Sequence, residues 1–119
     1  MTIKVIGSLT SPFVRTVRTA CAELSVEYDL LETTFYKKMS DADQAIIDSN
    51  NPLMKVPVLL DGEQVVLDSR VIIEYLRDKF ETSPVFKSGY ANKAEEQNII
   101  TTIYGMVDAG VLRFILSSE

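Results

Sequence analysis

The hydrophobic pattern opens with a short apolar run and continues with a helical periodicity. Residues 3–6 are apolar and β-rich, the run ends at Gly7, and Ser11-Pro12 has the chemistry of a helix start. From residue 12 to about residue 24, apolar side chains recur at spacings of three and four, as in one amphipathic helix: Phe13, Val14, Val17, Ala20, Cys21 and Leu24. The opening unit is therefore predicted to be a strand, a short loop and a helix.

The next segments extend this unit. Residues 28–31 are predicted to form a second strand, parallel to the first because a helix connects them in a right-handed βαβ unit. Ser40, with Asp43 three residues later, resembles an N-cap arrangement before a short, poorly packed helix, which residues 48–52 are expected to stop.

A hairpin and a third helix complete the first domain. Residues 58–60 and 64–67 flank the turn pair Asp61-Gly62 and predict two antiparallel strands. Asp68 or Ser69 can cap the following helix, which has a mostly apolar surface up to residue 80. The element order is βαβαββα, and residues 1–80 are predicted to be one α/β domain.

The rest of the chain is predicted to be a linker and a long helix. Residues 81–91 interrupt the periodicity with Ser83-Pro84 and Ser88-Gly89, which is typical of a linker. Residues 92–119 form a separate helical part, with the helix running from about residue 92 to residue 116. Its apolar positions are Ile99, Ile100, Ile103, Met106, Val107, Leu112 and Ile115.

Composition narrows the classes of function. Against 17 acidic residues there are 12 basic ones, a net charge of -5, and no basic stripe, so we expect no nucleic-acid partner. The sequence contains no histidine, so no metal site and no histidine-dependent mechanism are expected. No apolar run is expected to approach the roughly 20 residues that span a bilayer, so no membrane partner is expected.

Cys21 is the single cysteine, so an intramolecular disulfide is impossible. Because the chain also opens without a charged segment and apolar run of the secretory type, a cytoplasmic location is predicted. Cys21 falls on the apolar face of the first helix and has no C-x-x-C partner, which predicts a core residue and argues against dithiol redox chemistry.

Three separated motifs carry a family resemblance. They are Gly7-Ser8-Leu9-Thr10-Ser11-Pro12-Phe13-Val14-Arg15, then Asn51-Pro52 followed by Lys55-Val56-Pro57-Val58-Leu59, and then Asp68-Ser69-Arg70 with Ile73-Glu74-Tyr75-Leu76. In this order, and with a βαβαββα pattern, they resemble the thioredoxin-like amino-terminal domain of the glutathione S-transferase family. The resemblance covers residues 3 to about 80 and is weaker through the long helix.

The resemblance implies glutathione as co-substrate, a small electrophilic substrate, and a homodimer or other self-association. Complete members continue into a helical domain, so residues 92–119 would be the first helix of an incomplete one. Its apolar positions would then be exposed, which is a second reason to expect self-association.

Ser11 is the candidate catalytic residue. As N-cap of the first helix it lies where backbone N–H groups and the helix dipole favour an anion. The resemblance implies that a hydroxyl on this loop donates a hydrogen bond to the glutathione sulfur and favours the thiolate. Ser8 and Thr10 are the alternatives for this role, and Ser11 alternatively only caps the helix.

Val56-Pro57 and Lys55 are candidates for binding the middle and the glycyl end of glutathione. The resemblance implies a cis bond before Pro57 and pairing of the Val56 backbone with the cysteinyl part; the alternative is a trans proline that starts an edge strand. It also implies that Lys55 contacts the glycyl carboxylate, with Lys38 as a weaker candidate. Both lysines are alternatively solvated surface charges.

Asp68 and Ser69 are candidates for binding the γ-glutamyl end of glutathione. They lie at a helix start, where a serine hydroxyl and backbone N–H groups can bind a carboxylate. The resemblance assigns this pair to the γ-glutamyl group, although Asp68 is shorter than the glutamate or glutamine usual there. The alternative is a simple capping pair.

These residues predict an enzyme that binds glutathione and activates its thiol for transfer to an electrophile. The alternative is a non-catalytic interaction module with the same fold, of the type associated with translation or with RNA polymerase. A glutaredoxin-like oxidoreductase would need a cysteine near Ser11, and the sequence has none.

Overall fold

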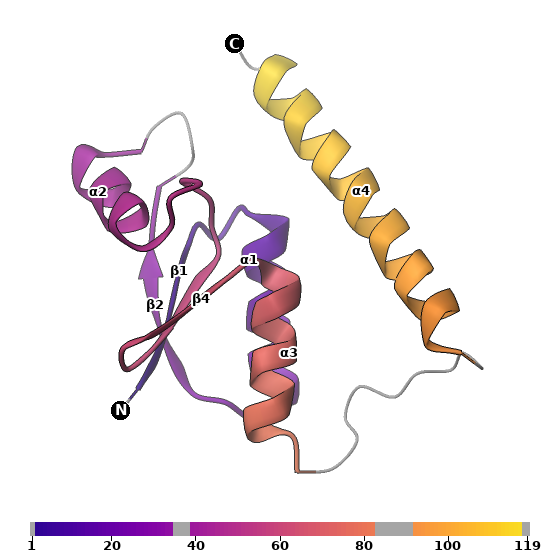
Figure 1. Cartoon of the computed structure of the whole chain (residues 1–119). Coiled ribbons are helices and arrows are strands. Elements are labelled where there is room, and N and C mark those ends of the chain that lie inside the picture. Colours follow the sequence, from indigo (N-terminus) through magenta and orange to yellow (C-terminus); the bar gives the residue numbers. More distant parts are fainter. Residues whose placement is uncertain (1, 35–38, 83–91, 118–119) are drawn as a thin grey trace. The chain divides into compact units, whose positions relative to one another are not determined.

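The computed structural model describes residues 2–34, 39–82 and 92–117, and the chain divides into two units, residues 1–85 and 86–119. The first unit contains β1 (Ile3–Gly7), α1 (Pro12–Glu23), β2 (Tyr28–Glu32), α2 (Asp41–Asn50), β3 (Val58–Asp61), β4 (Gln64–Leu67) and α3 (Ser69–Phe80), and the second contains α4 (Lys93–Ser117) (Figure 1). The predicted order βαβαββα is confirmed. The domain boundaries at residues 80 and 92 stay predictions.

Helix α2 ends at Asn50, within residues 48–52, where the sequence predicts that the helix stops. The Ser49 hydroxyl and the Asn50 side-chain amide both donate hydrogen bonds to the Ile46 carbonyl, at 3.0 and 2.9 Å. Both bonds lie in the last turn of α2. The helix stops at Asn51 because Pro52 disfavours a helical backbone in the residue before it.

The four strands form one sheet in the order β2-β1-β3-β4. β1 pairs with β2 in parallel, as predicted, and with β3 antiparallel; β4 returns antiparallel to β3. The register pairs Ile6 with Val58 and Val58 with Leu67. The end of β1, the start of β3 and the end of β4 therefore meet at one edge of the sheet (Figure 1).

The two faces of the sheet have separate cores. On one face Val5 and Leu59 are fully buried, as are Val14 of α1 and Ile72 of α3, two helices that contact each other. On the other face Ile6 and Val58 form a cluster with Ile47, the buried residue of α2. Since α2 packs through this one residue, it is the short, poorly packed helix that the sequence predicts.

Cys21 belongs to the core, as predicted. Its side chain is fully buried, and burial raises the pKa of the thiol to about 11. A thiol with this pKa is almost entirely protonated at neutral pH and is a poor nucleophile.

Replacing Gly7 by alanine is expected to lower the free energy of unfolding by about 1–3 kcal/mol. An added Cβ would collide with Cγ2 of Val14, a buried, β-branched side chain with few alternative rotamers. Urea unfolding measures the loss. Gly110→Ala in α4 is the matched control, because a Cβ there meets nothing within 4 Å. A Gly7→Ala variant as stable as the original chain would contradict the close packing of α1 on β1.

Polar contacts fix α3 to the hairpin. The Tyr75 hydroxyl donates a hydrogen bond of 2.6 Å to the Asp61 carboxylate, which also forms an ion pair with Lys79. These contacts, with Lys79 as the larger cause, lower the pKa of Asp61, and the bond to Asp61 raises the pKa of Tyr75. The lowered pKa of Asp61 means that its contribution to stability is present above about pH 4 and is lost as the pH falls through the folded-state value.

A Tyr75→Phe variant is expected to have a free energy of unfolding about 1 kcal/mol lower than the original chain at neutral pH, and a smaller difference at an acid pH below the folded-state pKa of Asp61. Protonated Asp61 is a weaker acceptor than the carboxylate, so the lost bond matters less in acid. Urea unfolding at both pH values tests this. Tyr28→Phe is the control, because the Tyr28 hydroxyl accepts a hydrogen bond of 3.0 Å from Arg18 Nε and, among the described residues, no carboxylate bonds it. The effect of Tyr28→Phe on the free energy of unfolding should therefore not change in acid. Equal effects of Tyr75→Phe at both pH values would contradict the linkage.

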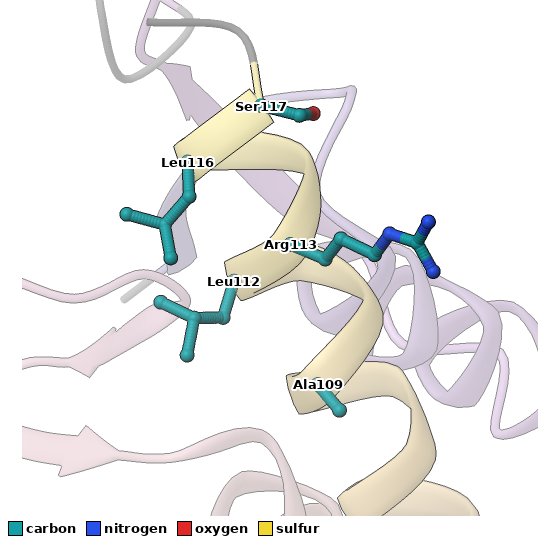
Figure 2. A pocket seen from close by; sticks show the side chains of 5 residues that line it. All are labelled: Ala109, Leu112, Arg113, Leu116 and Ser117. Atoms are coloured by element: carbon teal, nitrogen blue, oxygen red, sulfur yellow. The ribbon is translucent and has the colours of Figure 1, made fainter.

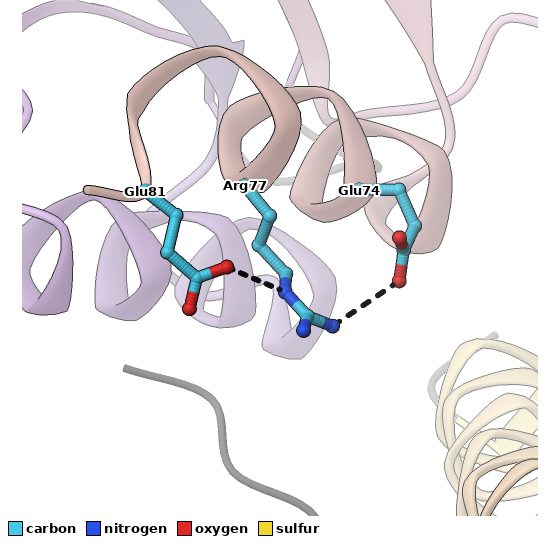
Figure 3. A network of polar contacts seen from close by, with 3 residues as sticks. All are labelled: Glu74, Arg77 and Glu81. Atoms are coloured by element: carbon cyan, nitrogen blue, oxygen red, sulfur yellow. Dashed lines mark hydrogen bonds and ion pairs between the residues drawn. The ribbon is translucent and has the colours of Figure 1, made fainter. Parts of the chain in front are cut away.

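Three charged side chains form an ion-pair network at the C-terminal end of α3 (Figure 3). Arg77 lies between Glu74, at 3.5 Å, and Glu81, at 3.4 Å. The Glu74 side chain is 63% exposed, so this pair contributes little to stability, while the whole network favours the helical conformation over the last turn.

Helix α4 is long and apolar. Leu112 and Leu116 point to the same side of the helix, while Arg113 points away from them (Figure 2). Each leucine is 58% exposed, and they line a shallow hollow with Ala109, Arg113 and Ser117. None of the α4 residues that the structure describes is buried.

The apolar character of α4 exceeds the sequence expectation. Its most apolar window has a mean hydropathy of 1.6, and the helix is long enough to cross a membrane. This differs from the expectation that no apolar run approaches that length, and the reason is that only Asp108 and Arg113 carry charge between residues 97 and 117. The core helix of a soluble protein meets the same criteria, so this property alone assigns no membrane role.

Candidate functional site

The three sequence motifs converge at the sheet edge where β1 and β4 end and β3 begins. Ser11 follows β1, Val56 precedes β3, and Ser69 follows β4. The strand register, and not any one motif, brings them to this edge. Two surface hollows are lined by other described residues: one is on α4, and the other is lined by residues such as Thr2 and Tyr28 at the start of β1 and β2.

Ser11 is the N-cap of α1, as predicted. Its backbone is extended (φ -75°, ψ 125°), and its hydroxyl accepts a hydrogen bond of 3.3 Å from the Val14 N–H. Among the described residues no acceptor for the Ser11 O–H hydrogen is observed, so this hydrogen is available to a ligand. The half-buried Ser11 therefore combines a helix N-terminus with a spare donor.

The alternative hydroxyls on this loop, those of Ser8 and Thr10, form a hydrogen bond with each other. Ser8 and Thr10 share a hydrogen bond of 2.7 Å, and the Thr10 N–H also donates to the Ser8 hydroxyl at 3.2 Å. Ser8 is only 9% exposed. This bond uses one of the two hydroxyl hydrogens, so one of these residues keeps a hydrogen to donate, and both stay alternatives to Ser11.

The segment before β3 has the expected backbone form. The Val56-Pro57 peptide bond is cis, as the resemblance implies. Pro57 is buried, and the half-buried Val56 packs against the cluster of Ile6, Ile47 and Val58. Lys55 is exposed, whereas Lys38 lies outside the described residues.

Asp68 and Ser69 form the turn into α3. Ser69, the first residue of the helix, is only 1% exposed. Asp68 is the N-cap, but its side chain makes no capping hydrogen bond and is exposed. Its backbone has a positive φ of 73° with ψ 130°, a conformation that costs free energy in any residue except glycine and that is concentrated at functional sites.

Asn51 is a further residue near this edge to which the sequence analysis gave no role. It is only 3% exposed, and its side chain accepts from the Leu53 N–H and donates to the Lys55 carbonyl, both at 2.9 Å. The available signal was an asparagine before proline at the end of a helix, five residues before Val56. Sequence alone does not show that its side chain turns back along the following loop.

From residue 5 to residue 84 the chain matches the family model described as glutathione S-transferase, N-terminal domain. The chain belongs to the glutathione S-transferase family. It is 37% identical over 81 residues to glutathione S-transferase U17 of Arabidopsis thaliana, an alignment that covers 68% of this chain and 34% of that relative.

Two solved glutathione S-transferases extend the comparison to structure. The Tau class enzyme from mango, Mangifera indica, is 26% identical with a TM-score of 0.69, over 90% of this chain and 46% of the mango protein. Rice GST1, solved in complex with glutathione, is 32% identical with a TM-score of 0.57, over 67% of this chain and 34% of the rice protein. The fold is thus the thioredoxin-like amino-terminal domain of the glutathione S-transferases followed by a long helix, and the chain spans half or less of the length of these relatives.

Proposed function

We propose that this chain binds glutathione at the sheet edge and activates its thiol for transfer to an electrophile. The observation that carries the proposal is the convergence of Ser11, Val56 and Ser69 at one edge of the sheet. The complex of the rice relative with glutathione supports it. No metal takes part in the proposed reaction.

Each candidate residue has a role in the proposal. The backbone of Val56, held by the cis bond to Pro57, pairs with the cysteinyl part of glutathione. Asp68 and Ser69 bind the γ-glutamyl amino and carboxylate groups, and Lys55 binds the glycyl carboxylate. These contacts leave the glutathione sulfur beside the Ser11 hydroxyl.

In the proposed reaction the glutathione thiol loses its proton to solvent, and Ser11 stabilises the thiolate by donating a hydrogen bond. The thiolate sulfur then forms a bond to the electrophilic atom. In a substitution the leaving group departs with the electrons of its bond; in an addition the electrons of the multiple bond move to the neighbouring atom, which takes up a proton from solvent. A charge-assisted hydrogen bond and the N-terminus of α1 both stabilise the negative charge on the sulfur, so they favour the thiolate over the thiol.

The experiment is a conjugation assay with glutathione and a general aromatic electrophile, followed by absorbance. The proposal predicts a rate proportional to protein concentration that saturates with glutathione. A rate equal to that without protein would overturn the catalytic part.

A non-catalytic interaction module with the same fold is the second candidate, and the same measurements separate it from the first. Saturable glutathione binding without conjugation would favour this candidate. The small electrophile itself is unassigned.

We also propose that the chain self-associates through α4, and as a homodimer in the simplest case. Leu112 and Leu116 are exposed on one side of this helix, and a soluble monomer rarely exposes an apolar stripe of this kind. Light scattering coupled to size exclusion should give a mass above that of one chain, and a Leu112→Glu, Leu116→Glu variant should shift toward the monomer. A monomer at tens of micromolar would contradict this.

A cytoplasmic location completes the proposal. Cys21 is free and buried, which fits a reducing compartment, where structural disulfides are rare.

A further inference from the structure

Asn51 connects the end of α2 to the segment that precedes β3. Its four polar groups all form hydrogen bonds: the backbone N–H with the Ile47 carbonyl at 2.7 Å, the carbonyl with the Met54 N–H at 3.0 Å, and the two side-chain groups with Leu53 and Lys55. Buried polar groups satisfied in this way hold a single loop conformation.

We propose that Asn51 is a positioning residue for the glutathione site: by holding the Lys55 carbonyl it fixes the Lys55–Val56 peptide unit against which the cysteinyl part of glutathione pairs. This inference rests on the proposed function. The Asn51 side chain is buried and bonds the backbone of the loop, so its effect on the ligand passes through Val56.

The chemistry of the side chain explains why asparagine stands here. Pro52 restricts Asn51 to an extended backbone, and its observed φ of -136° and ψ of 111° agree. In this conformation the carboxamide supplies an acceptor for the Leu53 N–H and a donor for the Lys55 carbonyl. An aspartate of the same shape offers only acceptors, so it would keep the first bond and place a negative oxygen against the Lys55 carbonyl.

The loop that Asn51 spans is anchored at both ends in one core. Ile47, whose carbonyl accepts from Asn51, and Val56, which follows Lys55, pack in the same cluster on the sheet. Between them Met54 has a positive φ of 54°, a conformation that the surrounding bonds must hold. The binding segment is therefore ordered before any ligand arrives, which reduces the entropy lost on binding.

The test compares Asn51→Asp with Asn50→Asp. Asn50 is the adjacent residue, its side-chain amide donates to the Ile46 carbonyl at 2.9 Å, and its replacement makes the same change of charge without touching the loop. Calorimetric titration with glutathione, well below the melting temperature of each variant, should give a Kd about tenfold higher for Asn51→Asp and a nearly unchanged Kd for Asn50→Asp.

A second readout needs no ligand. In ¹H–¹⁵N spectra of the free protein the Val56 amide signal should move in Asn51→Asp and stay in place in Asn50→Asp, because the Val56 nitrogen belongs to the same peptide unit as the Lys55 carbonyl. A lower melting temperature with unchanged Kd and an unmoved Val56 signal would overturn the inference, and so would a raised Kd with an unmoved signal. If the original chain binds no glutathione, the proposed function fails, and the Val56 signal alone decides whether Asn51 orders this segment.

Discussion

Replacing Ser11 by alanine is expected to raise the thiol pKa of bound glutathione by about one to two units. A hydrogen bond to a charged group contributes about 1.5–3 kcal/mol, and each pKa unit corresponds to about 1.4 kcal/mol. The Ser11 O–H is the donor available at the start of α1, so its loss leaves the thiolate with the helix N-terminus alone. The ultraviolet absorbance of the thiolate, followed against pH in a saturated complex, measures this shift.

The control must separate the loss of a donor from the loss of a helix cap, which by itself costs about 1 kcal/mol. Ser40→Ala serves this purpose, because Ser40 caps α2 through a bond of 3.1 Å to the Asp43 N–H and lies outside the three motifs. Both variants should lose similar stability, while only Ser11→Ala should change the thiol pKa. Equal thiol pKa values in Ser11→Ala and the original chain would remove Ser11 from the proposed catalytic role.

Replacing Ser69 by alanine is expected to raise the Kd for glutathione about 10- to 100-fold. In the proposal the Ser69 hydroxyl and the N-terminus of α3 bind the γ-glutamyl carboxylate, and a bond to a charged group of this kind contributes about 1.5–3 kcal/mol. Ser69 is 1% exposed, so water compensates poorly for the missing hydroxyl. Calorimetric titration measures the Kd.

Ser49→Ala is the matched control for this variant. Ser49 carries the same side chain on the exposed surface of α2, where its hydroxyl donates to the Ile46 carbonyl at 3.0 Å. The control should bind glutathione as the original chain does. If Ser69→Ala also binds with an unchanged Kd, the γ-glutamyl group lies elsewhere.

The fold follows closely from local sequence signals. The spacing of apolar residues predicts α1 and α3, and the pair Asp61-Gly62 predicts the β3–β4 hairpin, because each of these signals acts within a few residues. The end of α2 at Asn50 also lies within residues 48–52, as predicted. Residue type alone does not reveal the side-chain bonds from Ser49 and Asn50 to the Ile46 carbonyl in its last turn.

The candidate site is harder to derive from the sequence, because its parts meet only through the register of the sheet. Helix-start chemistry identifies Ser11 and Ser69, but nothing local indicates that they share an edge with Val56. The positive φ of Asp68 and the bonds of Asn51 are products of tertiary structure. The family resemblance supplied the roles of these residues, and the structure supplied their arrangement.

The most direct test of the central claim is calorimetric titration of the purified chain with glutathione and, in parallel, with cysteinylglycine, which lacks the γ-glutamyl group. We expect saturable binding of glutathione and binding of cysteinylglycine that is at least about tenfold weaker, because the dipeptide cannot use Asp68 and Ser69. No saturable binding up to millimolar glutathione, or equal affinity for the two peptides, would contradict it.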